Sequence, residues 1–289
     1  MLAYFDTNVF SNLLKREQGM TAQHEMDLRS SISAGRIVIP LSYLTLEETI
    51  AAPDDIRVAQ SLLIQKLSSP NRFIRPVSDI LAATIRSFAR YGVDRARVWM
   101  RGETLRLIHS NLHDVLVGTE PQDVVDRAVA VKSAQAEKQS FREVLRAIRR
   151  EILPAVRGLL GAAQSPTFEW FFDEKAVAVA ESFADRVGLL DECRSRGIDS
   201  LLAISAIRMA VGASLSFVYA AGFERRREKR SDSRDVLHAT LAAAAADVFV
   251  THDNPLREEL LSRVPLQHFR MMRLPDLLEE VAGTLHQGK

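Results

Sequence analysis

Strand and helix signals alternate only at the two ends of this 289-residue chain, and the long middle segment carries helical signals alone. Short apolar runs separated by amphipathic helices are typical of a parallel sheet with helices packed against it. Each end block is too small to bury a core by itself. The pattern therefore predicts one discontinuous α/β domain, residues 1–70 plus 224–289, interrupted by an all-helical insertion at residues 71–223.

The N-terminal block shows strand, helix, strand and helix in turn. Gly35 closes the second helix, and Pro40 ends the second strand because proline has no N–H to donate to a sheet. The expected order is strand 2–5, helices 9–15 and 22–34, strand 36–39, helices 42–50 and 53–67, and a break at 68–71.

The middle and the C-terminal block differ in their periodicity. From about residue 75 to 223, apolar residues recur at helical spacing without a fixed repeat period, which predicts a helical bundle or an extended helical arm. The alternation then returns. The expected order is helix 234–246, strand 248–250, helix 255–261, strand 269–274 and helix 275–285.

Composition limits the partners and the compartment. The net charge is +1, so any attraction to nucleic acid is local. Cys193 is the single cysteine, which excludes an internal disulfide and cysteine-rich zinc sites. The N-terminus lacks the zones of a signal peptide, and we expect a cytoplasmic protein.

One apolar segment, residues 200–223, is long enough to span a bilayer. Arg208 lies well inside it, and a central arginine costs about 2.5–3.5 kcal/mol on insertion scales. A single span would also put Asp6 and Asp235 on opposite sides of the membrane. We therefore expect a buried central helix and no membrane contact.

Carboxylates stand at the ends of the predicted elements in both α/β blocks. Asp6 and Asp253 each follow a strand, whereas Asp235 and either Glu47 or Glu48 lie in neighbouring helices. If these strands are neighbours in a parallel sheet, the acids converge at its C-terminal edge. Such a cluster needs a cation, because like charges raise one another's pKa. Oxygen ligands without a cysteine or a histidine pair suit Mg²⁺ or Mn²⁺.

Three sequence blocks resemble the signature motifs of PIN domains, the nuclease fold of VapC-type toxins and related RNA-cleaving proteins. They are YFDTNVF at 4–10, IPLSYLTLEETI at 39–50 and DVLHATLAAAAADVFVTHD at 235–253. The resemblance covers about 70 residues at the N-terminus and 60 at the C-terminus. It implies a PIN-like three-layer α/β/α domain with a parallel sheet. Some enlarged PIN-like proteins also carry a helical segment before the third acid.

The resemblance also implies site roles. Asn8 and Thr251 would orient the ligands or water. Glu48 has the family's usual offset from the serine before the helix, so it is preferred to Glu47; neighbours on a helix point about 100° apart. Asp232 lies one turn before Asp235 and either replaces or assists it. The implied metal-binding and catalytic quartet is Asp6, Glu48, Asp235 and Asp253.

Each candidate also has a plain structural interpretation. An aspartate before a helix is commonly only an N-cap, and residues 253–255 also fit a turn and helix start. We expect His238 to be packed or hydrogen-bonded near Asp235, His252 to face solvent, and Asp247 to have a structural role. Weighed together, the acids favour the metal site.

A basic run precedes the third acid. It is either a solvated helix end or a surface that contacts phosphates. No aromatic residues interleave with it, so base stacking is not implied. Arg142, Arg146, Arg149 and Arg150 form a second basic face with the same two interpretations. The run consists of Arg225, Arg226, Arg227, Lys229 and Arg230, followed by Arg234.

The sequence thus predicts a Mg²⁺- or Mn²⁺-dependent endoribonuclease, with RNA as substrate by resemblance alone. The alternative is a catalytically inactive PIN-like module that binds nucleic acid or protein. An aspartyl phosphatase is disfavoured, because it needs an aspartate where Asn8 stands. The helical insertion has three open roles: recognition of structured RNA, homodimer formation, or binding of an antitoxin-type protein inhibitor.

Overall fold

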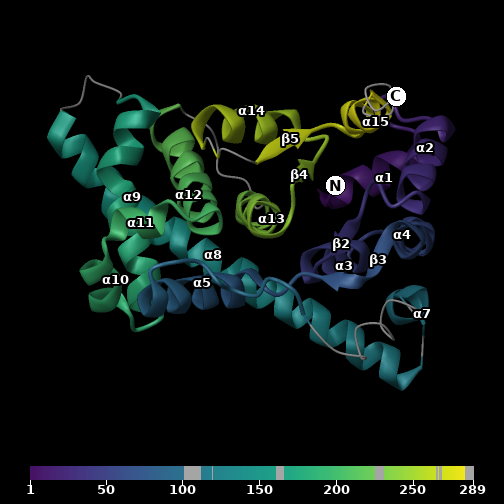
Figure 1. The fold of residues 1–289 in the computed structure, drawn as a ribbon, viewed down its shortest axis with the longest axis horizontal. Coiled ribbons are helices and arrows are strands. Elements are labelled where there is room, and N and C mark those ends of the chain that lie inside the picture. Colours follow the sequence, from purple (N-terminus) through teal and green to yellow (C-terminus); the bar gives the residue numbers. More distant parts are fainter. Residues whose placement is uncertain are drawn as a thin grey trace.

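The structure, a computed structural model, describes residues 1–100, 112–118, 120–160, 166–224, 231–264, 266 and 269–283. It is a mixed α/β protein, mostly helical, with a small parallel sheet (Figure 1). The first half contains β1 (Ala3–Phe5), α1 (Thr7–Lys15), α2 (Ala22–Ser33), β2 (Ile39–Leu41), α3 (Tyr43–Ile50), α4 (Asp54–Leu67), β3 (Ser68–Phe73), α5 (Val77–Tyr91), α7 (Leu112–Val117) and α8 (Pro121–Leu160). The second half contains α9 (Phe168–Arg186), α10 (Leu190–Arg196), α11 (Ile198–Leu202), α12 (Ser205–Phe223), α13 (Asp232–Ala245), β4 (Val248–Val250), α14 (Asn254–Arg263), β5 (Arg270–Met272) and α15 (Leu274–Gly283).

The sheet joins the two ends of the chain. β1 pairs in parallel with β4, and β4 pairs in parallel with β5. A parallel bridge from Leu2 to Val38 connects β1 to the second pair, β2 and β3, which is also parallel. The first strand and the strand at 248–250 are therefore parallel neighbours, which is the condition on which the expected convergence of the acids depends, and the ends of β1 and β4 lie side by side.

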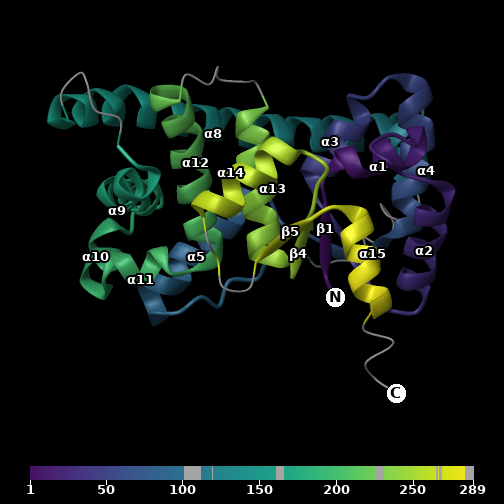
Figure 2. The same cartoon turned by 90° about the horizontal axis from the view of Figure 1, so that it is seen from above.

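Helices cover both faces of these strands. Successive side chains along a strand point to opposite faces, so each strand contributes to two apolar clusters. Tyr4 and Phe249 are buried in one apolar cluster with Leu237 of α13. Phe5 and Val250 are buried in a second cluster that includes residues of α1, α2 and α15. Figure 2 shows the strands between α13 on one side and α15 on the other. Helices are therefore packed against both faces of the sheet.

The helical middle is continuous with one of these cores. Tyr4 and Leu44 share a buried cluster with residues of α5, α8, α9 and α12. α8 crosses the molecule along its lower edge in Figure 1 and packs against α3, α7, α12 and α13. The domain boundaries at 70/71 and 223/224 stay a prediction, and the buried core crosses them.

The apolar segment tested for membrane insertion contains α12, the one helix among the described residues that is long and apolar enough to cross a bilayer. Most of its residues are buried inside the protein, against α8, α9 and α13. Its charged residue, Arg208, lies with its guanidinium carbon 5.2 Å from the centre of the Phe172 ring. The helix is a central packing element of this fold.

Two sequence predictions about the second strand pair are wrong. Strand β2 starts later than expected and contains Pro40, and the expected break at 68–71 is part of β3. The ladder between them is irregular: Ile39 pairs with Ser68 and Leu41 with Phe73. The intervening residues of β3 are exposed or partly exposed, so Pro70 is accommodated in a bulge where no ladder N–H is needed.

Candidate metal centre

The site begins where β1 and β4 end. Asp6 follows β1 directly and is the N-cap of α1, which begins two residues earlier than the helix expected at 9–15. Its Oδ2 accepts hydrogen bonds from Asn8 Nδ2 at 2.7 Å and from Thr251 Oγ1 at 2.9 Å. Thr251 follows β4, so the two neighbouring strand ends together fix the orientation of one carboxylate.

The segment after β4 is tied to the same point. Asp253 caps α14 by accepting from Leu256 N at 2.9 Å, and its own N–H donates to Thr251 Oγ1. The expectation that His252 faces solvent is wrong: the residue is only 9% exposed, and its ring Nδ1 lies 2.9 Å from Asn12 Nδ2. His252 packs this loop against α1 and takes no part in the acidic group.

Helix α3 sends its two adjacent glutamates to different partners. Glu47 faces α8, where Lys138 Nζ lies 2.5 Å from its Oε1. Glu48 faces α13, where Arg234 Nη1 and His238 Nε2 lie 3.1 and 3.2 Å from its two carboxylate oxygens. Of the two, Glu48 is the one that lies beside Asp6.

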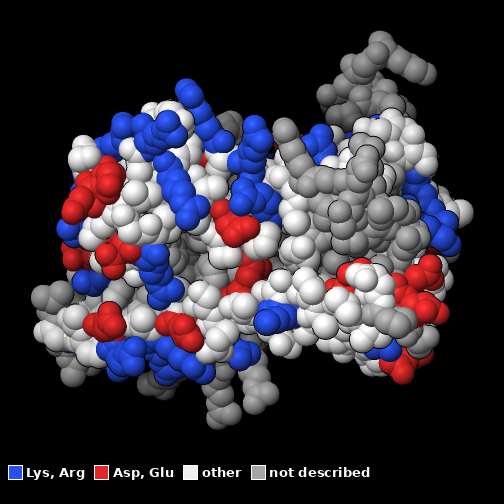
Figure 3. Space-filling view, turned by 90° about the horizontal axis from the view of Figure 1, so that it is seen from below, with Lys and Arg blue, Asp and Glu red and all other residues white. Residues whose placement is uncertain are grey.

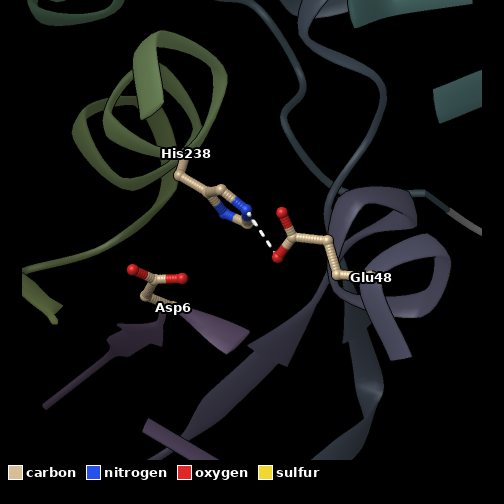
Figure 4. Close-up of side chains that lie close together, drawn as sticks. All are labelled: Asp6, Glu48 and His238. Atoms are coloured by element: carbon tan, nitrogen blue, oxygen red, sulfur yellow. Dashed lines mark hydrogen bonds and ion pairs between the residues drawn. The ribbon is translucent and has the colours of Figure 1, made fainter. Parts of the chain in front are cut away.

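Asp6, Glu48 and His238 converge from three separate elements (Figure 4). Each can offer one ligand atom such that all three atoms lie within 4.8 Å of one another. Asp6 follows β1, Glu48 lies on α3 and His238 lies on α13, so His238 is at least 190 residues from the two carboxylates in the chain. This buried carboxylate–imidazole group can hold a metal ion.

His238 also anchors a chain of hydrogen bonds behind the site. Its Nδ1 lies 2.8 Å from the Tyr4 hydroxyl, which lies 2.9 Å from Ser42 Oγ, and Ser42 Oγ lies 3.1 Å from Thr45 Oγ1. With a protonated ring, each group can donate to the next, from His238 to Thr45. The chain holds the imidazole in one orientation beneath the sheet edge.

The charges of Glu48 and His238 stabilise each other. Burial raises the pKa of Glu48, but the charge and hydrogen bond of His238 and the charge of Arg234 outweigh it and bring the pKa to about 2. Burial lowers the pKa of His238, whereas the acidic groups of Tyr4, Glu48 and Asp6 raise it well above its usual value. When no metal ion is bound, these pKa shifts favour a Glu48 carboxylate paired with a His238 imidazolium, and His238 would have to lose its proton to bind a metal ion.

Asp235 is in the opposite situation. Burial and the negative charge of Asp6 raise the pKa of its carboxyl to about 7, and the charges of Asp253 and Asp232 act in the same direction. The pKa of Asp6 is also raised, first by burial and then by the charge of Glu48. Because these acids repel one another, a cation placed among them would be strongly favoured.

Of the remaining residues named from the sequence, some lie near the acidic site and others lie far from it or outside the described residues. Asp232 is almost fully buried at the start of α13 and contributes to the potential at Asp235. Asp247 accepts a hydrogen bond from Leu2 N at 2.7 Å, at the end of β4 remote from the site. The run of Arg225, Arg226, Arg227, Lys229 and Arg230 lies outside the described residues. Arg234, which follows that run, binds Glu48.

The sequence interpretation did not assign His238, Arg234 or Tyr4 to the site. The spacing of Asp235 and His238 was the available signal, because residues three apart on a helix share a face. The role of Tyr4 had no such signal, since its hydroxyl meets a histidine 234 positions away.

Comparison of the chain with protein-family models, with curated proteins and with solved structures found no match.

Proposed function

We propose that this protein is a divalent-metal-dependent endoribonuclease whose site is formed by Asp6, Glu48, Asp235 and Asp253. The observation that carries the proposal is the convergence of Asp6, Glu48 and His238 within 4.8 Å, next to a further carboxyl whose pKa is raised to about 7. Perturbed carboxyl groups at the C-terminal edge of a parallel sheet are typical of functional sites.

The side chains fit a hard divalent cation. Asp6 and Asp235 supply oxygen ligands whose mutual repulsion a cation would relieve, and oxygen ligands suit Mg²⁺ or Mn²⁺. A bound ion of this kind supplies Lewis-acid stabilisation of a phosphodiester under attack and lowers the pKa of an attacking water. Thr251 and Asn8 orient the Asp6 carboxylate, and His238 with Arg234 holds Glu48 in place.

The choice of RNA rests on the resemblance to PIN domains, since the acids alone would also accept DNA. Helices on both faces of a short parallel sheet support a PIN-like three-layer arrangement. The protein contains more helix than a PIN-like domain alone would have. This supports the proposal of an enlarged member that carries a helical insertion.

The test is cleavage of single-stranded and structured RNAs with Mn²⁺, comparing the wild type with Asp6→Asn and Asp235→Asn. Each substitution keeps the side-chain shape and removes one negative ligand, so we expect a loss of about 100-fold or more. Asp247→Asn is the matched control, because that aspartate lies at the end of β4 remote from the site and accepts a hydrogen bond from the backbone N–H of Leu2.

Two results would contradict the proposed nuclease site. Metal-independent cleavage, or cleavage that survives equally in Asp6→Asn and Asp247→Asn, would show that another group or a contaminant acts. Circular dichroism of each variant separates loss of activity from loss of folding.

A second function is supported by one observation: Glu48 already has two cationic partners, His238 and Arg234. An inactive PIN-like module could keep its acids in this way without metal, and would bind nucleic acid or protein instead. Titration calorimetry with Mn²⁺ alone separates the two functions. Heat of binding that disappears in Asp235→Asn supports the nuclease, and no binding to a folded wild type supports the module.

A further inference from the structure

A positively charged groove lies between α8 and α12, away from the acidic group. It has a volume of about 620 Å³, and four of its eight lining residues are arginines: Arg146, Arg149, Arg150 and Arg157. The other lining residues are apolar or small, and no acidic side chain lines the groove. Such a concentration of guanidinium groups requires an explanation in a chain whose net charge is only +1.

Several of these arginines are available to a ligand. All four are exposed. Arg157 is held in place by its hydrogen bond to the Gly222 carbonyl at 2.8 Å and keeps its charge. Arg146 and Arg150 have no ion-pair partner in the part of the chain that the structure describes. Positive charges that are exposed, clustered and not neutralised favour an anionic partner.

The arginines share one face of a single helix. Positions 146, 150 and 157 fall within a narrow angular range at 100° per residue, and they extend over about 16 Å of the helix at 1.5 Å per residue. Successive members are one or two turns apart, a spacing that matches a repeating anion better than a single one. Guanidinium groups bind phosphate oxygens in a fork geometry.

One side of the groove lies near the start of α13. A smaller adjoining depression shares Arg149 and Ala221 with the groove and reaches Asp232. Asp232 begins α13 and lies one helical turn before Asp235. Figure 3 views the molecule from below, the side on which α8 lies in Figure 1, and shows Lys and Arg side chains gathered in a row along the lower left edge.

We propose that this arginine groove binds the sugar-phosphate backbone of a single-stranded RNA and directs the strand toward Asp235. The identity of the strand as RNA rests on the proposed function. The lining favours a nucleic acid over an acidic protein segment, because it lacks the aromatic or large apolar pocket that anchors a protein partner. Without aromatic stacking partners, the contact is independent of base sequence.

The experiment measures binding of a fluorescein-labelled, mixed-sequence 15-nucleotide RNA by anisotropy, without metal, at several salt concentrations. Every protein carries Asp6→Asn so that the probe stays intact. Arg146→Gln/Arg150→Gln should weaken binding about tenfold and lower the magnitude of the salt slope by about 1.4, the loss of two phosphate contacts to a single strand. Arg86→Gln/Lys132→Gln is the charge-matched control; these residues are exposed on α5 and on the distant half of α8. The control should leave binding unchanged.

Equal affinity and equal salt slope in the groove variant and the control would overturn the proposal. It would also fail if polyglutamate of similar length bound as tightly as the RNA with the same dependence on Arg146 and Arg150, since the groove would then be a protein-docking surface. The proposed activity fails separately: RNA bound through the groove but not cleaved by the protein with Asp6 intact and Mn²⁺ present refutes the nuclease and leaves the groove.

Discussion

Burial opposes ionisation of both Glu48 and Asp235, but the neighbouring charges differ between these two sides of the acidic site. On one side, Glu48 is ionised because His238 and Arg234 supply positive charge from the protein. On the other, burial and the negative charges of Asp6, Asp253 and Asp232 raise the pKa of Asp235 to about 7. Removing the charge of Glu48 should therefore destabilise the fold, and removing the charge of Asp235 should stabilise it. A cation would therefore relieve more repulsion beside Asp235 than beside Glu48.

The largest expected effect is that of Glu48→Gln on stability. The substitution leaves a buried imidazolium without its counter-charge, since the His238 side chain is only 4% exposed. Breaking such a pair typically costs about 3–5 kcal/mol, and we expect about 3 kcal/mol in urea unfolding monitored by circular dichroism. Glu181→Gln removes a surface ion pair with Arg194 and is the control, at under about 1 kcal/mol.

A double-mutant cycle sharpens this result. In Glu48→Gln/His238→Gln both charges are absent, so the double variant should lose less stability than the sum of the single losses. Additive losses would mean that Glu48 and His238 do not interact as a charged pair, and the proposed contrast between the two sides would fail.

The next effect is that of metal on stability. If Asp6 and Asp235 bind Mn²⁺ in the folded state only, Mn²⁺ at 100 times its dissociation constant should raise the free energy of unfolding by about 2.7 kcal/mol. Adding EDTA should reverse the gain. Asp235→Asn should abolish it, whereas Asp247→Asn should keep it. A gain of equal size in Asp235→Asn would place the ion elsewhere.

A smaller effect is the pH dependence caused by Asp235 in metal-free protein. Its pKa rises from 3.8 to about 7 on folding, so the folded state binds the proton more tightly and stability falls as the pH rises through this window. Asp235→Asn should remove that loss and gain about 1–2 kcal/mol at pH 8, with little change at pH 4. Unfolding at both pH values measures it; a destabilised variant at pH 8 would contradict the repulsion.

The parts that could be predicted from the sequence are those set by local chemistry. A triplet of buried apolar residues followed by Asp6, and another followed by Thr251, indicated β1 and β4 through signals only a few residues long. The parallel sheet then brings the ends of both strands together, as their order in an α/β pattern implies.

The parts that could not be predicted depend on residues distant in the chain. The pairing of Glu48 with His238 joins positions 190 residues apart and follows from how α3 and α13 pack. Strand β3 was missed because Pro70 signals a turn locally, while pairing with β2 and an irregular register override that signal. Tertiary contacts, rather than propensity, determine both features.

The smallest effect, at Glu137, tests whether the behaviour of Asp235 comes from its acidic neighbours. Glu137 of α8 accepts from Ser78 N at the start of α5, and burial raises its pKa to about 7. Glu137→Gln keeps an acceptor oxygen and removes the cost of ionisation, so we expect a gain of about 1 kcal/mol at pH 8 that disappears near pH 4. Because Glu137 lies outside the Asp6–Glu48–His238 group, the one candidate metal-binding group among the described residues, Mn²⁺ should stabilise this variant as much as the wild type. Two carboxyl groups with similar pKa values would then respond differently to the same ion, and only Asp235, whose pKa the charge of Asp6 helps to raise, would belong to a metal site. An equal loss of the Mn²⁺ effect in Glu137→Gln and Asp235→Asn would instead mean that the ion acts through the general electrostatics of the fold.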